Sequence, residues 1–372
     1  MNYQNNRFSF ELANREDGEQ ILDILEENDF KGKVALIYTR RPDAYSSLKR
    51  EGEEVVIIVC RDHKLDRGAG FAACSINRLY FNGEEKRVGY LSGLRIARKY
   101  RKQFHLLHRG YHFLEDILAD KNIDYYLTTI LEENKIVQRL LEKKRKFMPW
   151  YEYLDQYHVY TIKTGLRLNE KKRPELILKQ ARPEDYSQVL DFIEKEGGSN
   201  QFFPILDKNI LKDKWELESG DFYYLYDQDS NQIVAAGACW DQTEYKQYIV
   251  QNYGGIYKLL APISKVFPLF GYPPLPPVGS ILNFFTLSFW TVKDNDGDIF
   301  QYFLSSISRR FGGIYSFFNI GLISSHPLCG IVKDIPHLVY KSRLYLVNWE
   351  KEEERVGQLK DKYPLYLECG LL

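Results

Sequence analysis

Five cations crowd one short stretch of the chain, LRIARKYRKQF at residues 94–104. They are Arg95, Arg98, Lys99, Arg101 and Lys102. A strand pattern ends at Ile96 and a helix follows, so the cations lie at a strand-to-helix turn. Because a helix start presents unpaired N–H groups and a partial positive charge, such a turn is suited to binding phosphate. A solvent-exposed charged loop explains the same composition, and both interpretations stay open at this point.

The basic run also contains Tyr100 and Phe104, a mixture that can grip RNA. The chain as a whole has 51 Lys and Arg against 51 Asp and Glu, so no global positive field favours nucleic acid. It also lacks a recognisable RNA-binding signature. We therefore expect no nucleic-acid partner.

Three histidines follow the turn, and their spacing would place them on one helix face. His105, His108 and His112 stand at i, i+3 and i+7, and three imidazoles on one face can hold zinc. Apart from Glu115 and Asp116, no carboxylate or cysteine has a suggestive spacing beside them. Histidines on a helix face more often pack or face solvent, so we expect no metal site.

An acidic turn, TVKDNDGDIF at residues 291–300, is the counterpart of the basic turn in the second half of the chain. An EF-hand calcium loop would place Val292 and Phe303 at its first and last ligand positions, and neither can bind calcium. The sequence instead predicts an Asp-rich cap on a helix that begins near Ile299.

The elements that must position these turns occur in two similar sets. ANREDGEQILDIL at residues 13–25 and ARPEDYSQVLDFI at residues 181–193 share identities and helical apolar spacing. The first set predicts strands at 8–12, 53–62, 68–96 (two strands joined at Asn82-Gly83), 124–129 and 153–163, with helices at 16–28, 111–120 and 134–144. The second predicts strands at 176–180, 222–227, 233–240, 281–292, 316–323 and 342–349, with helices at 184–196 and 299–311.

This order predicts an α+β protein of two tandem domains, each a mixed, largely antiparallel sheet flanked by helices. The charged stretch KTGLRLNEKKRP at residues 163–174 separates the two sets. We place the first domain at residues 1–165, a linker at 166–174 and a divergent second domain at 175–372. A length of 372 residues suits two ordinary domains.

Composition narrows the cellular setting. Five cysteines are scattered without a C-x-x-C pair, which favours a reducing compartment. The first residues lack a signal-peptide pattern, and the most apolar region, Phe267 to Trp290, is interrupted by prolines and is too short to span a bilayer. We expect a cytoplasmic protein without a membrane span. Its apolar end, PLYLECGLL, could pack on either domain or across a homo-oligomer contact.

The doubled element order resembles the GNAT acyltransferase superfamily in a tandem arrangement. In that family the sheet splays open after its fourth strand, pantetheine lies in the splay, and a turn with the pattern R/Q-x-x-G-x-G/A holds the pyrophosphate of acyl-CoA. Arg101 takes the arginine position of this pattern, and NKIVQRLLEKKRKF at residues 134–147 is similar to a later family motif. The resemblance implies CoA contacts from Leu94, Arg95, Ile96, Arg101, Lys102, Gln103, Phe104, His105, Leu106 and Asn134.

The chain departs from the family pattern at three positions of the first half. Phe104 and Leu106 replace the two small residues of the turn, so their side chains would have to point into the core for their amides to remain accessible. Leu141 replaces the tyrosine that often protonates the leaving thiolate, so another acid is needed. In the second half Asp294, Asp296 and Asp298 would repel a pyrophosphate.

The resemblance implies acetyl-CoA, or another acyl-CoA, as cosubstrate of an N-acyltransferase, with CoA held by the first domain and a small-molecule or peptide amine as acceptor. The catalytic base is unassigned: Tyr90, Ser92, Glu132 and Glu133 are candidates by position alone. Two alternatives stay open. One is a GNAT-like binding or scaffold protein without turnover, and the other is an aminoacyl transferase of related fold.

Overall fold

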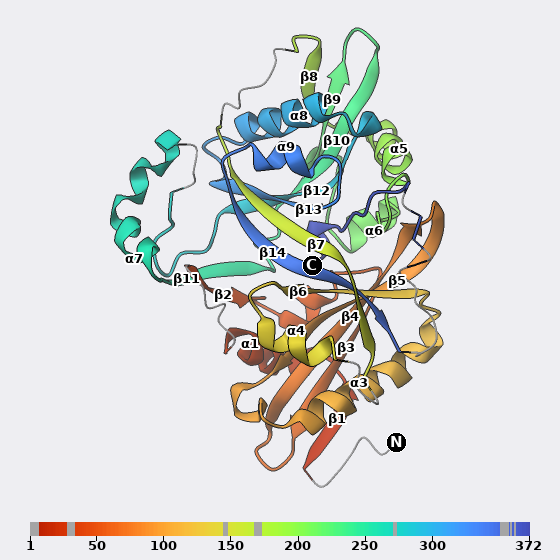
Figure 1. Cartoon of the computed structure of the whole chain (residues 1–372), viewed down its shortest axis with the longest axis vertical. Helices are drawn as coiled ribbons and strands as arrows, with labels where there is room; N and C mark the ends of the chain where they lie inside the picture. The colour runs from red at the N-terminus through yellow and green to blue at the C-terminus, as the bar shows by residue number, and fades with distance from the viewer. Residues whose placement is uncertain are drawn as a thin grey trace.

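We analysed a computed structural model of the chain, which describes residues 7–27, 34–143, 148–166, 173–270, 274–349, 357, 359–360 and 362–372. Both halves form one continuous sheet with helices on its two faces (Figure 1). The α+β class expected from the sequence is confirmed. Phe147, in the motif that begins at Asn134, and most of the expected linker (167–172) lie outside the described residues.

The twelve strands of the sheet follow an order that alternates between the two halves at its centre. In spatial order they are β1 (Phe8–Leu12), β3 (Glu54–Asp62), β4 (Arg67–Phe81), β5 (Glu84–Ile96), β6 (Tyr125–Leu131), β14 (His337–Asn348), β7 (Trp150–Lys163), β13 (Phe317–Ile323), β12 (Phe284–Val292), β10 (Gln232–Trp240), β9 (Phe222–Asp227) and β8 (Leu176–Gln180). A second, two-stranded sheet pairs β2 (Val34–Thr39) with β11 (Gln247–Tyr253).

The long strands β7 and β14 exchange places between the halves. β14, from the second half, pairs with β6 of the first, while β7, from the first half, pairs with β13 of the second. The two strands also pair with each other along almost their whole length. The sequence predicted both strands but not this exchange, and strand pairing therefore crosses the expected boundary at residues 166–174. Whether the two segments act as separate domains stays a prediction.

Helices cover both faces of the first half. The helix α1 (Gly18–Glu26) packs on Val55, Ile57 and Val59 of β3, together with α2 (Ala44–Leu48). The helix α3 (Phe104–Leu118) packs on Val56 and Ile58 of the same strand. Because successive residues of a strand point to opposite faces, α1 and α3 lie on opposite sides of the sheet. The short helix α4 (Lys135–Leu141) joins the α3 side.

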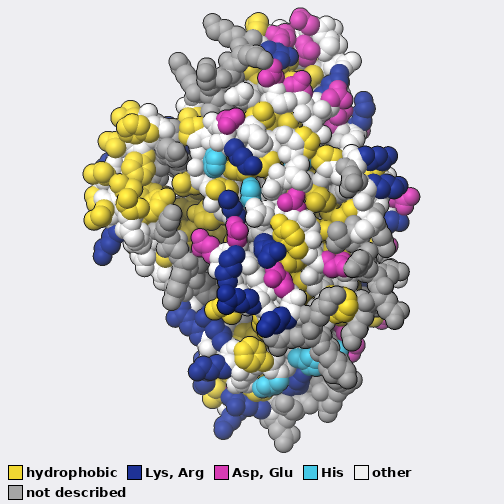
Figure 2. All heavy atoms as spheres, in the orientation of Figure 1, with side chains coloured by type: hydrophobic (Ala, Val, Ile, Leu, Met, Phe, Trp, Pro, Cys, Tyr) yellow, Lys and Arg dark blue, Asp and Glu magenta, His cyan; other side chains and the backbone are white. Residues whose placement is uncertain are grey.

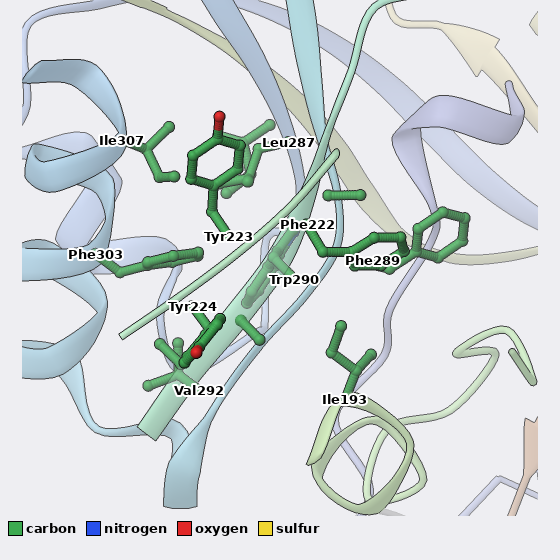
Figure 3. Packing of buried hydrophobic residues seen from close by; sticks show 14 of the residues in the cluster. Ile193, Phe222, Tyr223, Tyr224, Leu287, Phe289, Trp290, Val292, Phe303 and Ile307 are labelled. Atoms are coloured by element: carbon green, nitrogen blue, oxygen red, sulfur yellow. The ribbon is translucent and has the colours of Figure 1, made fainter. Parts of the chain in front are cut away.

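The second half has the same layered plan around a larger aromatic core. Phe303 and Ile307 of α8 (Gly297–Arg310) lie on one side of the strands, and Ile193 of α5 (Tyr186–Gly197) lies on the other (Figure 3). Phe289 and Trp290 of β12 are buried in this core. The described part of this half also contains the shorter helices α6 (Lys208–Asp213), α7 (Ile256–Leu260) and α9 (Cys329–Lys333).

The repeated sequence forms the same local structure at the start of each half. Asp17 accepts a hydrogen bond from the amide of Asn14 at 2.9 Å, and Asp185 accepts one from the amide of Arg182 at 3.2 Å. The alanine before each turn also has the same role: Ala13 donates to Ile57 O and Ala181 to Phe222 O, each at 2.8 Å. The repeated residues therefore build the same entry from edge strand to helix.

Candidate functional site

The strands β5 and β6 separate at the centre of the first half. They form a parallel pair only at Val88↔Tyr125, Gly89↔Tyr126 and Tyr90↔Leu127, although both strands continue beyond. At the point of separation, Thr128 Oγ1 donates to Leu91 O at 2.7 Å, and the hydroxyls of Tyr90 and Thr129 lie 2.6 Å apart. Beyond this point, the backbone groups of β5 and β6 no longer pair with each other.

A bulge on β5 lies beside this opening. Phe71 pairs with Arg95 while Ala73 pairs with Ser92, so β5 carries one extra residue here. Gly93 has a φ of +65°, and a Cβ at this position would lie 2.9 Å from the ring of Phe71. Only glycine fits both requirements. The bulge turns the last strand residues Leu94 to Ile96 relative to the upstream strand.

The turn after β5 is anchored by a buried tyrosine. Ala97 donates to Ala69 O at 3.0 Å, and the 3₁₀ helix η2 (Arg98–Tyr100) follows. Tyr100 is fully buried, packs edge-on against Phe8, and donates from its hydroxyl to Asp62 Oδ2 at 2.8 Å. The hydrogen bond from Arg7, together with that from Tyr100, lowers the pKa of Asp62 to about 2. The cationic turn is therefore held to the end of β3.

The start of α3 lacks a side-chain cap. Gln103 occupies the N-cap position and its side chain accepts no capping hydrogen bond. The amides of Gln103 and Leu106 donate to carbonyls inside the turn. Within the described part of the chain, by contrast, nothing accepts a hydrogen bond from the amides of Lys102, Phe104 and His105. These three N–H groups, at the positive end of a helix dipole, could bind an anion.

The two bulky residues of the turn differ in their orientation. Leu106 is buried in the core formed by α1, β1 and β3, as expected. Phe104 is 66% exposed, so the expectation that its side chain enters the core is wrong. At the first position of α3, its side chain faces solvent, and its amide is not covered by core packing. His105 lies edge-on to Phe8 with ring centres 6.1 Å apart.

The cations of the turn fall into two groups. Arg98, Lys99, Arg101 and Lys102 are exposed around the start of α3. Arg95 instead lies on the inner side: burial lowers its pKa, and Tyr38, Tyr248 and Arg40 lie in its electrostatic surroundings. The outer group can meet an anion at the turn, while Arg95 faces the second, two-stranded sheet.

Asn134, expected around CoA, and Leu141, at the position of the family's tyrosine, both have local roles. Asn134 caps α4, because its side-chain oxygen accepts from the amide of Val137 at 3.3 Å. Leu141 is buried against Leu107 and Tyr345, so it has no chemical role. Tyr345 comes from β14 and donates to Glu142 Oε1 at 2.6 Å.

A buried polar cluster lies on the α1 side of the opening, and sequence reasoning missed most of it. Glu51 forms a salt bridge with Arg40, and both side chains are almost fully buried. Ser92 of β5 donates to Glu51 Oε2 at 3.4 Å. Arg40 also donates to Ser47 Oγ at 3.0 Å. Ser92 was a candidate by position, whereas Arg40 and Glu51 are far from it in sequence and carried no local signal.

The second half contributes a lysine to this cluster. Lys246 is buried and donates from Nζ to the carbonyl oxygen of Leu372. Burial lowers its pKa to about 8, with Glu51 and Arg40 among its charged neighbours. Burial also raises the pKa of Tyr90, so this tyrosine stays protonated and can act as a donor. Leu372 packs in the same apolar cluster as Tyr90.

The other residues considered for chemistry lie outside this cluster. Glu132 and Glu133 follow β6, and the amide of Glu132 donates to Lys341 O of β14 at 2.9 Å. His108 and His112 stack edge-on, and His112 Nδ1 lies 3.3 Å from Glu115 Oε2. Over the described residues there is no group of three or more His, Cys, Asp or Glu arranged to hold a metal ion.

The second half has the same opening, but the chain itself fills it. The strands β12 and β13 pair only from Phe284↔Phe317 to Thr286↔Asn319. The 3₁₀ helix η8 (Cys369–Leu371) packs against both strands. Glu368 Oε2 accepts from the amide of Phe289 at 2.6 Å and from the Tyr366 hydroxyl at 2.6 Å. Phe289 has a φ of +51° and lies at a bulge, like Gly93 in the first half.

The acidic turn of the second half is capped by its own side chains. Asp296 Oδ1 accepts from the amide of Ile299 at 3.0 Å, which confirms the predicted cap. The amide of Asp294 donates to Glu196 Oε2 at 3.3 Å. Carboxylates therefore occupy the place where an anion would bind, and the helix start needs no external partner.

Comparison with known proteins identifies the fold but no sequence family. No family model matches the chain, and no curated protein matches its sequence. Among solved structures, a GCN5-related N-acetyltransferase from Sphaerobacter thermophilus is similar over 92% of this chain and 96% of its own, with a TM-score of 0.58 and 11% identity. N-myristoyltransferase from Saccharomyces cerevisiae, with bound myristoyl-CoA, is similar over 94% and 84%, with a TM-score of 0.60 and 11% identity.

A third solved structure, a probable N-acyltransferase of unknown function from Enterococcus faecalis, covers 91% of this chain and 72% of its own, with a TM-score of 0.51 and 11% identity. At such low identity these likenesses concern the fold. They show that the chain has the GNAT fold over most of its length, as its element order implied. None of the helices in the described part combines the length and apolar character needed to cross a bilayer.

Proposed function

We propose that this protein is an acyl-CoA-dependent N-acyltransferase that holds CoA in its first half. The observation that carries the proposal is the combination of the open β5–β6 splay with the uncapped start of α3. The fold supports it, because similar structures include N-acyltransferases, one with bound myristoyl-CoA. The second half supports it by contrast, since its splay and its turn are both filled.

In this proposal the pyrophosphate binds the amides of Lys102, Phe104 and His105, with Arg101 and Lys102 neutralising its charge. The pantetheine arm runs along Leu94, Arg95 and Ile96 into the splay. Gln103 and Leu106 shape the turn without offering their own amides, which are already bonded within it. Asn134 acts indirectly, because it fixes the start of α4.

Transfer then takes place where β5 and β6 separate. The neutral amine of the acceptor attacks the thioester carbonyl, a C–N bond forms and the C–S bond breaks. The thiolate takes up a proton, and the proton that the attacking nitrogen loses returns to the proton donor, so no net proton is released. Tyr90 is the proposed proton donor to the thiolate, because it bridges the splay to Thr129 and its raised pKa keeps it protonated. The acceptor amine enters from the side of Ser92 and Glu51. Holding both substrates together supplies much of the rate.

An acetyl group is the acyl group proposed for transfer, and a small molecule or a peptide carries the acceptor amine. The proposed compartment is the cytoplasm, which agrees with five cysteines that are all free thiols. Equal numbers of acidic and basic residues support an acceptor other than nucleic acid.

Calorimetric titration with acetyl-CoA and with myristoyl-CoA tests the proposal directly. We expect binding with a dissociation constant in the micromolar range, and an at least tenfold loss of affinity in Arg101→Glu. Lys293→Glu is the matched control, because it reverses a charge at the acidic turn of the second half and should leave the affinity unchanged. Equal affinities in the wild type and Arg101→Glu would refute the placement of the pyrophosphate.

Absence of binding at millimolar acyl-CoA would instead favour a scaffold without turnover. Transfer from charged tRNA but not from acyl-CoA would favour the aminoacyl transferase reading. If binding is seen, a Tyr90→Phe variant separates binding from chemistry. We expect unchanged CoA affinity and a roughly hundredfold lower kcat, a typical contribution of one general acid.

A further inference from the structure

An arm made of two consecutive short helices and a proline-rich return projects from the second half. It leaves the end of β11 at Gly254, continues through α7 and the 3₁₀ helix η5 (Ala261–Phe270), and returns towards β12 (Figure 1). The return is tied to the arm, since Tyr253 donates to Pro276 O at 2.6 Å and Ser264 Oγ to Leu275 O at 3.4 Å. The described part of the return is therefore fixed to η5 and to the end of β11.

The arm exposes large apolar side chains. Figure 2 shows them as a concentrated hydrophobic patch on the projection at the left of the molecule. Six of these side chains belong to α7 and η5, with exposed fractions between 47% and 83%: Ile256, Leu259, Ile263, Val266, Leu269 and Phe270. Scattered exposed apolar residues are ordinary, but a contiguous patch of this kind marks an interaction surface.

The spacing of these residues places much of the patch on one side of η5. Ile263, Val266 and Leu269 recur every three residues, which is the repeat of a 3₁₀ helix, so they share one ridge of η5. Ser264, on another ridge, is buried and bonded to Ala261 O. One side of the arm is thus held by its own return segment, and the other is apolar and exposed.

The charged residues of the arm indicate the kind of surface that it would bind. From Gly254 to Asn283 the only ionisable acidic or basic side chains are Lys258 and Lys265, and both are exposed. An apolar surface flanked by lysines and free of carboxylates matches an anionic lipid surface, because each lysine near the headgroups strengthens binding. Tyr257 and Phe267 add aromatic rings of the kind that favour the membrane interface.

We propose that this arm docks the protein reversibly onto an anionic membrane surface, with η5 lying in the headgroup region. The inference rests on the arm and not on acyl transfer. The arm continues directly from β11, and β11 pairs with β2 of the first half. Along this edge the rings of Tyr38 and Tyr248 pack with their centres 5.1 Å apart. Docking would therefore fix the orientation of the first half towards the lipid.

Flotation of the full chain with phosphatidylcholine vesicles, with and without an equal part of phosphatidylglycerol, tests the proposal. We expect binding to the anionic vesicles, weakened by raised salt, and little binding to phosphatidylcholine alone. Leu269→Glu with Phe270→Glu should lower the bound fraction at least tenfold. Lys258→Gln with Lys265→Gln should lower the membrane partition coefficient roughly thirtyfold, about fivefold for each lysine, and remove most of the salt dependence.

Ile314→Glu is the matched control, because Ile314 is 54% exposed in the second half but lies outside the arm. Its vesicle binding should equal that of the wild type, and circular dichroism should show that all variants are folded. Failure of the wild type to bind anionic vesicles would overturn the proposal. So would light scattering that shows a wild-type dimer converted to a monomer by the Leu269 and Phe270 substitutions, since the patch would then be a contact between copies.

Discussion

The two halves of this protein share an opening in the sheet, a bulge beside it and a turn into a helix, yet they treat the opening differently. In the first half Gly93 stands at the bulge and the start of α3 has no side-chain cap. In the second half Phe289 stands at the bulge, Glu368 binds its amide, and Asp296 caps α8. The comparison teaches that the fold supplies the opening, and local side chains decide whether an external ligand can use it.

The same contrast extends to charge. Cations surround the first turn, whereas carboxylates occupy the second. A buried salt bridge, a lysine and a tyrosine lie beside the first opening, whereas aromatic side chains dominate around the second. The groups beside the first opening therefore fit the proposed charged ligand and proton transfer, whereas the chain itself fills the second opening.

The largest expected effect comes from removing the buried carboxylate in the second opening. Glu368→Ala leaves the amides of Phe289 and Gly370 and the hydroxyl of Tyr366 without their buried acceptor. We expect a loss of roughly 4 kcal/mol in the free energy of unfolding, because hydrogen bonds to charged groups are strong and unsatisfied buried donors are costly. Urea denaturation measures it. Glu368→Gln should lose less, and equal losses in the two variants would argue against the hydrogen bonds as the cause.

Lys246 gives the comparison a pH dependence. Its pKa is lowered from 10.5 to about 8, so between pH 8 and 10.5 the unfolded chain binds more protons than the folded one at this site. Stability from this group therefore rises with pH across that window, by about 3 kcal/mol. Lys246→Met should remove that rise. Other groups also titrate there, so the measurement is the difference between the two stability curves, and parallel curves would contradict the burial of a charged lysine.

Gly93 tests whether the bulge of the first half needs glycine. Gly93→Ala forces a side chain into a positive φ and against the ring of Phe71. We expect a loss of about 1–2 kcal/mol in stability together with weaker CoA binding, because the strand residues beyond the bulge would shift. Thermal unfolding and calorimetry measure the two effects. Full CoA affinity in this variant would show that the bulge does not shape the ligand site.

The smallest expected effects on stability come from exchanging the residue types at the N-cap positions of α3 and α8. Gln103→Asp should give α3 a cap and raise stability by about 0.5–1 kcal/mol, while the new carboxylate should weaken CoA binding. Asp296→Gln in the second half should lower stability by about 1 kcal/mol without changing CoA affinity. An affinity that is unchanged in Gln103→Asp would mean that the anion does not bind at this helix start.

Much of the fold could be predicted from local patterns. The bounds of β1, β8 and β9 agree with the predicted ranges, because each is a short apolar alternation bounded by turn residues. The exchange of β7 and β14 could not be predicted. Both strands alternate apolar and polar residues, and this pattern fits pairing with β6 as well as with β13, so tertiary contacts decide the partner and the register. The strands β2 and β11 were missed because each is short and gains its partner from the other half.

The candidate site was predictable only where residues are neighbours in the chain. The basic turn was found because its cations lie within a few positions of each other. Glu51, Arg40 and Lys246 were missed, because only the folded chain brings them together and a single buried ion in a sequence has no distinctive pattern. The prediction for Phe104 was wrong because it relied on the apolar character of the side chain. As the first residue of α3, Phe104 faces solvent.

The crossed strands at the middle of the sheet also govern how the molecule is made. During synthesis β6 emerges long before its antiparallel neighbour β14, because strands β7 to β13 lie between them in the sequence. The wall of the first opening is thus completed only after those intervening strands have been translated. The proposed ligand site of the first half therefore cannot form fully before the second half is made, which gives the second half a role although its own opening is filled.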